Sequence, residues 1–125
     1  MLSDHAIETA KENTKYSLDA PHHEHNDCIR IAYEWLDAQK RTQNPTTKTY
    51  PIKHIIEKWA GRYVSTTDVE VAAHIHPEIK GKYPHFNISS RLTEPSTERL
   101  KEISEAFKHT YRERHDKSVY KSHEP

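Results

Sequence analysis

The stretch PIKHIIEKWAGRYVSTTDVEVAAHI, residues 51–75, decides the fold that the sequence predicts. In its first half, apolar residues recur three and four positions apart, the spacing that places them on one face of an amphipathic helix. Pro51 is tolerated in a first helical turn, and Gly61 offers a C-terminal stop. We therefore expect a helix over residues 51–62.

A second helix is expected in the other half of this stretch. Thr67 and Glu70 have the spacing of a capping box, in which the side chains of the N-cap and N3 residues bond each other's backbone. Apolar residues follow as far as residue 75, and Pro77 discourages continuation beyond them. The second helix is therefore predicted over residues 67–75.

Three further helices are predicted on either side of this pair. Asn26 is a good N-cap for an apolar stripe over residues 27–42, which carries both an acidic first turn and a basic last turn. A short helix is expected over residues 86–92, and a last long helix from Ser96 to about residue 111. The predicted fold class is a small all-α domain.

Composition sets the size of this domain and its limits. The chain has 125 residues with formal charge zero, and its Leu, Ile, Val and Phe together make up about 17%. Such a chain buries a modest core, and we expect loose ends around it. Residues 24–112 are the predicted helical domain, residues 1–23 a flexible N-terminal segment with a short frayed helix, and residues 113–125 a flexible C-terminal tail.

The zero net charge is a cancellation between segments. Residues 1–39 carry three basic and eight acidic side chains, whereas residues 40–63 carry six basic and one acidic. No acidic residue lies between Glu78 and Glu94. Because the field that a partner meets is local, this distribution keeps a polyanionic partner possible.

The helix over residues 51–62, the capped helix over residues 67–75 and the segment NISSRL (residues 87–92) together resemble a winged helix-turn-helix DNA-binding domain. The resemblance covers about residues 51–95 and implies that a third helix enters the major groove of duplex DNA. Two features depart from the family pattern. The connection over residues 75–86 is longer than the usual three or four residues, and no hairpin that would form a wing follows the third helix.

This resemblance implies a set of DNA contacts. Arg91 is expected to bind guanine or a phosphate, and Asn87 to bind adenine. Phosphate contacts are expected from the remaining candidates, namely Thr66, Thr67, Lys80, Lys82, His85, Ser89 and Ser90. The DNA hypothesis also depends on whether one face holds the basic residues Lys53, Lys58, Arg62, Lys80, Lys82 and Arg91.

The sequence thus predicts a non-catalytic, sequence-specific DNA-binding regulator. It has no cofactor and no evident grouping of nucleophile, base and oxyanion donor. Dimerisation is expected through the helix over residues 26–42, since small regulators often bind paired half-sites. The N-terminus lacks a signal sequence, which predicts a cytoplasmic protein without a membrane span. The alternative function is a protein-interaction module, an adaptor or an inhibitor, that presents its acidic N-terminal third to a basic partner.

The histidine-rich composition raises a metal hypothesis that we do not favour. His22, His23, His25 and Cys28 carry ligand atoms suited to zinc, but their spacing matches no standard zinc pattern. We expect solvated histidines, no bound metal, and a buried structural cysteine. With 11 histidines, the net charge rises steeply below about pH 6.5, and affinity for DNA is expected to rise with it.

Overall fold

The computed structural model describes all 125 residues and is mostly helical, with a few short strands. The α-helices are α1 (Asp4–Asn13), α2 (Asn26–Asp37), α3 (Ile52–Ala60) and α4 (Thr66–Ile75). The strands are β1 (Gly81–Lys82), β2 (His85–Phe86), β3 (Thr93–Glu94) and β4 (Ser122–His123). The all-α prediction is therefore corrected to a small, α-dominated domain that contains strands.

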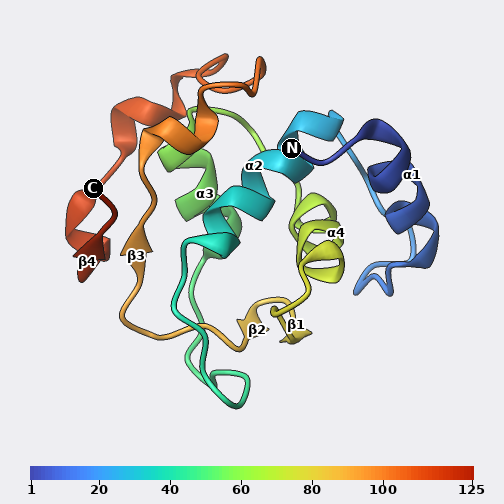
Figure 1. Ribbon diagram of the computed structural model, residues 1–125, viewed down its shortest axis with the longest axis horizontal. Coiled ribbons are helices and arrows are strands. Elements are labelled where there is room, and N and C mark those ends of the chain that lie inside the picture. The colour runs from blue at the N-terminus through green and yellow to red at the C-terminus, as the bar shows by residue number, and fades with distance from the viewer.

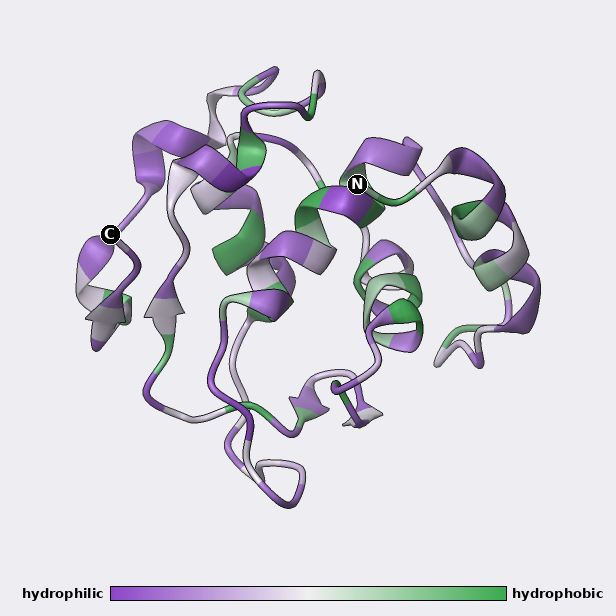
Figure 2. Ribbon diagram, viewed as in Figure 1, coloured by the Kyte–Doolittle hydropathy of each residue, from purple (hydrophilic) through white to green (hydrophobic).

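Helix α2 lies at the centre of the molecule, between α3 and α4, and α1 lies on the far side of α4 (Figure 1). Hydrophobic residues concentrate on these central helices, and hydrophilic residues follow the outlying loops (Figure 2). The apolar stripe of α2 is fully buried in the single core cluster. Its members are Cys28, Ile29, Ile31, Ala32, Trp35 and Leu36.

The predicted helix pair is present, but a different capping box begins the second helix. The Ser65 hydroxyl accepts a hydrogen bond from the Asp68 N–H, and the Asp68 carboxylate accepts one from the Ser65 N–H. Thr67, the predicted cap, is the second residue of the helix and is buried. Gly61 ends α3 in the left-handed conformation, as its position in the sequence indicates.

Helix α2 ends at Asp37 and does not continue to Thr42. Beyond it the backbone bonds another segment of the chain: the Thr42 N–H donates to the Asn87 carbonyl, and the Ser89 N–H donates to the Lys40 carbonyl. These long-range hydrogen bonds outweigh the helical propensity of residues 38–42, because they satisfy backbone groups that also pack against the core.

The helix predicted over residues 86–92 is wrong. Residues 85–86 form β2, which pairs antiparallel with β1, and Ile88 makes an isolated bridge with Arg41. Asn87 and the serines that follow it are weak helix formers, because their side chains compete for backbone hydrogen bonds. The inward positions of Phe86, Ile88 and Leu92 are nevertheless as expected, since all three are buried.

The long helix predicted from Ser96 is also wrong. A 3₁₀ turn covers Thr97–Leu100, and irregular turns follow it. The Phe107 and His109 N–H groups donate to the carbonyls of Ala60 and Gly61, at the C-terminal end of α3. This docking consumes backbone donors that a continuous helix would use internally, and it places Phe107 at a φ of 63°.

Both ends of the chain, expected to be flexible, contact the core. Ile7 and Ala10 of α1 are buried. Strand β4 pairs parallel with β3, and Tyr120, just before β4, is only 4% exposed. The Trp35 indole N–H donates to the Tyr120 hydroxyl over 3.1 Å. Packing therefore crosses both of the expected boundaries, after residue 23 and after residue 112.

Candidate nucleic-acid interface

Two acid-free segments, residues 38–56 and 79–93, lie side by side at one end of the molecule (Figure 1). The Thr42 and Thr46 N–H groups donate to the carbonyls of Asn87 and Phe86 over 2.8 and 3.0 Å. The Tyr50 hydroxyl donates to the Ser90 carbonyl over 2.5 Å. Stretches that are separate in the sequence thus form one surface without a negative charge of their own.

We call this surface the basic end and define it as residues 40–50 and 80–91. Its lysines have no carboxylate partner, because only Lys11, Lys53 and Lys117 among the lysines of the chain form ion pairs. Arg91 is exposed and has none. Arg41 is the exception, since it pairs with Asp37 and Glu78. The unpaired cations of the basic end are Lys40, Lys48, Lys80, Lys82 and Arg91.

The hairpin of β1 and β2 holds the cations of the second segment against the first. Gly81 allows it to close: its φ is +101°, and a Cβ there would lie 2.3 Å from the His85 carbonyl oxygen. The His85 ring approaches the Thr46 carbonyl oxygen through Nδ1 over 3.1 Å. Lys80 and Lys82 are exposed on this hairpin.

The remaining predicted contacts fall into two groups. Ser90 is exposed, and Thr66, His85 and Ser89 are half-buried. Thr67 and Asn87 are buried, and both side chains bond the chain's own backbone. The Thr67 hydroxyl donates to the His22 carbonyl, while the Asn87 amide bonds the Lys80 N–H and the Glu78 carbonyl. We therefore leave Thr67 and Asn87 out of the interface.

The basic residues of α3 do not join this surface as the sequence led us to expect. Arg62 is buried and pairs with Glu105, and Lys53 pairs with Glu57. Lys40 and Lys48 take their place, although the sequence pattern placed Lys40 in the last turn of a helix and indicated no role for Lys48. The acid-free run over residues 38–56 was the signal that could have identified them.

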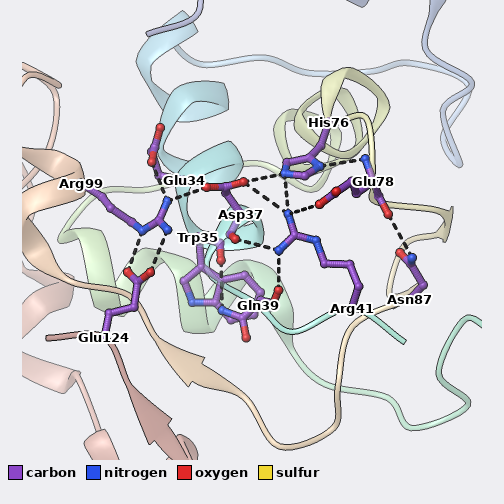
Figure 3. A network of polar contacts seen from close by, with 10 residues as sticks. All are labelled: Glu34, Trp35, Asp37, Gln39, Arg41, His76, Glu78, Asn87, Arg99 and Glu124. Atoms are coloured by element: carbon purple, nitrogen blue, oxygen red, sulfur yellow. Dashed lines mark hydrogen bonds and ion pairs between the residues drawn. The ribbon is translucent and has the colours of Figure 1, made fainter. Parts of the chain in front are cut away.

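A chain of charged groups connects the basic end to the C-terminus (Figure 3). Arg99 donates two hydrogen bonds to the Glu124 carboxylate and one each to Glu34 and Asp37. Burial raises the pKa of Asp37, but hydrogen bonds from His76 and Arg99 outweigh it and keep the pKa below its ordinary value. Asp37 is therefore a carboxylate at neutral pH.

His76 fixes the other side of this chain of contacts. Its Nδ1 accepts the Glu78 N–H over 3.1 Å, while its Nε2 lies 2.8 Å from the Asp37 carboxylate and 2.9 Å from Arg41 Nη2. Arg41 contacts the same carboxylate. The Glu78 carbonyl accepts a hydrogen bond from the Asn87 amide. The charged groups therefore contact both segments of the basic end, residues 40–50 through Arg41 and residues 80–91 through Asn87.

The histidines near residue 25 are dispersed over different partners. His23 contacts Asp68 over 2.8 Å, and His25 caps α2 by accepting the Asp27 N–H. Burial raises the pKa of the Cys28 thiol to about 12, and its Sγ donates to the Tyr63 carbonyl. No group of three or more His, Cys, Asp and Glu side chains is arranged to hold a metal ion.

Comparison with protein-family models, curated proteins and solved structures finds no match to this chain. None of its helices has the length and apolar character that crossing a bilayer requires.

Proposed function

We propose that the protein is a non-catalytic DNA-binding protein whose basic end binds the phosphate backbone of duplex DNA. One observation carries the proposal: two segments without acidic residues, 38–56 and 79–93, hydrogen-bond to each other, and they carry five cations that have no carboxylate partner. Cations without a carboxylate partner are free to replace the counterions condensed on DNA, which is the main source of sequence-independent affinity.

Loops and a hairpin make these contacts in the proposal, and no helix enters the major groove. Helices α3 and α4 lie on opposite sides of α2 and do not pack on each other as the two helices of a helix-turn-helix do. Apart from its ends, α4 is unsuited to groove contact, since most of its residues are buried between α1 and α2. We further propose that the protein is a transcriptional regulator that recognises a specific DNA sequence. The exposed Arg91 is the side chain that we assign to contact with a base.

The test compares two triple variants with equal charge changes. Lys40→Gln/Lys80→Gln/Lys82→Gln removes three cations from the basic end, and Lys101→Gln/Lys108→Gln/Lys121→Gln removes three exposed, unpaired cations from the C-terminal third. Binding to a labelled 20-base-pair duplex is measured by fluorescence anisotropy at several salt concentrations.

We expect the first variant to lower the slope of log affinity against log salt by about two to three, and the second to change it little. Equal losses in both variants would show that the net charge alone matters and would contradict the basic end as the site. Wild-type protein that forms no salt-sensitive complex would favour the protein-interaction alternative.

A further inference from the structure

A groove of about 670 Å³ lies beside the basic end, bounded by residues 13–17 after α1, by α4 and by the β1–β2 hairpin. Its volume is within the range of small-molecule sites. Lys80 and Lys82 belong both to its wall and to the basic end. A strand bound along the basic end can therefore continue into the groove.

Aromatic and apolar side chains form part of the groove wall. Tyr16 and Tyr83 both line it, together with Ala73, Ile79 and Phe86. Both tyrosine hydroxyls are engaged: Tyr16 donates to the Lys11 carbonyl over 2.8 Å, and Tyr83 accepts the Lys53 N–H over 3.2 Å. The rings are thus held in place, and fixed aromatic rings are what a planar base stacks on.

Glu70 gives the wall one polar group with unused bonding capacity. Its Oε2 accepts the Ser17 N–H over 3.0 Å, whereas its Oε1 has no hydrogen-bond partner and is shielded from water. A buried acceptor without a partner is costly. Since the outer torsion of a glutamate is soft, the carboxylate can rotate and offer an oxygen to an N–H donor in the groove, at the expense of its hydrogen bond to Ser17.

Charged side chains of both signs line the groove. Lys15, Lys80 and Lys82 line it and are exposed and unpaired, and the Glu70 carboxylate lies among the same lining residues. The carboxylate disfavours a simple anion. A ligand that fits has an anionic end for the lysines, a planar body for the tyrosines and an N–H donor for Glu70.

We propose that this groove binds one unpaired nucleotide, with its phosphate on the lysines and its base against the tyrosines. Guanine is the preferred base, because its N1–H and N2–H₂ donors lie side by side and suit a carboxylate acceptor. As a site on a DNA strand, this rests on the proposed function, and it adds recognition of a single-stranded end next to the bound duplex.

The test uses Glu70→Gln, which keeps an amide oxygen for the Ser17 N–H and replaces the free acceptor with a donor. Glu102→Gln, an exposed and unpaired position, is the control with the same change in charge. Anisotropy is measured with a blunt duplex and with duplexes that carry a two-nucleotide overhang of guanine or of thymine. Chemical-shift titration with guanosine monophosphate provides a separate arm without a duplex.

We expect the guanine overhang to bind wild-type protein about tenfold more tightly than the blunt duplex, given the usual contribution of one stacked base. Glu70→Gln removes the preference for guanine over thymine and leaves blunt-duplex affinity within twofold. Tyr83→Leu weakens both overhangs, and Glu102→Gln changes neither.

Each outcome decides between the two proposals. Equal wild-type affinity for blunt and overhanging duplexes overturns the nucleotide site and leaves duplex binding intact. If no duplex binds but guanosine monophosphate shifts residues of the groove in wild type and not in Glu70→Gln, the nucleotide site stands and the duplex proposal fails. If the wild-type protein binds neither the duplexes nor guanosine monophosphate, both proposals are overturned.

Discussion

At the scale of single residues, Asn87 shows how one side chain can be assigned two incompatible roles. The sequence places it among base-contacting residues, whereas in the structure its amide accepts the Lys80 N–H over 2.6 Å and donates to the Glu78 carbonyl over 3.0 Å. We predict that Asn87→Ala lowers the free energy of unfolding by about 1–2 kcal/mol, because it removes the partner of the Lys80 N–H and of the Glu78 carbonyl.

Urea denaturation measures this loss, and DNA affinity of the folded fraction is measured beside it. Ser90→Ala is a suitable control, since Ser90 is exposed in the same segment and only its carbonyl is bonded, to Tyr50. If Asn87→Ala kept full stability but lost adenine preference, the side chain would be a base contact after all.

Arg91 is the residue for which the base-contact hypothesis survives, since its side chain is exposed and unpaired. We predict that Arg91→Ala costs about 1–3 kcal/mol of binding free energy at a preferred site and relaxes the base preference. Lys82→Ala is the comparison: it should weaken binding to every sequence equally and lower the salt slope by about one. Selection of bound duplexes from a random pool, followed by affinity measurement, separates the two effects.

At the scale of elements, the hairpin of β1 and β2 joins stability to the proposed function. A Cβ at Gly81 would meet the His85 carbonyl oxygen, and the φ of +101° is unfavourable for any other residue. We predict that Gly81→Ala destabilises the protein by about 2 kcal/mol and also weakens duplex binding, since Lys80 and Lys82 flank the strained position. Thr97→Ala, an exposed change outside the basic end, is expected to affect neither.

Calorimetry and anisotropy on the same samples test this joint effect. If the Gly81→Ala protein bound duplex as tightly as wild type, the contribution of Lys80 and Lys82 to duplex affinity would not depend on the shape of the hairpin.

The elements also show where sequence patterns suffice. Periodic apolar residues predicted α2, α3 and α4, because these helices bury the same stripes that the pattern defines. The predicted N-caps Asn26 and Thr67 are wrong, since His25 caps α2 and Ser65 caps α4. The helices predicted over residues 86–92 and 96–111 are wrong. Backbone groups of the first segment bond the loop over residues 40–46, and those of the second bond the end of α3. Propensity and periodicity carry no information on such distant partners. The same pairing brings Lys40 and Lys48 to the basic end.

At the scale of the whole molecule, buried and half-buried carboxylates make stability depend on pH. Burial raises the pKa values of Asp27, Asp37 and Glu94, but hydrogen bonds that these carboxylates accept outweigh it. Hydrogen bonds from Arg99 lower the pKa of Glu124. A carboxylate whose pKa is lower in the folded state binds fewer protons there than in the unfolded chain. The stabilisation is therefore complete above the unfolded pKa values, near pH 5, and is lost as pH falls through the folded values.

We predict that the urea midpoint of wild-type protein is constant around pH 6 and falls steadily from about pH 5 to pH 3. Asp37→Asn removes the shared acceptor of His76 and Arg99 (Figure 3). This substitution should lower the free energy of unfolding by about 1 kcal/mol at pH 6, a value reduced for the partial exposure of Asp37. The loss should be smaller at pH 3, where the wild-type carboxylate is itself becoming protonated. Asp19→Asn, an exposed and unpaired change, should follow wild type throughout. A difference between Asp37→Asn and wild type that stayed constant from pH 6 to pH 3 would show that Asp37 acts by packing and not by its charge.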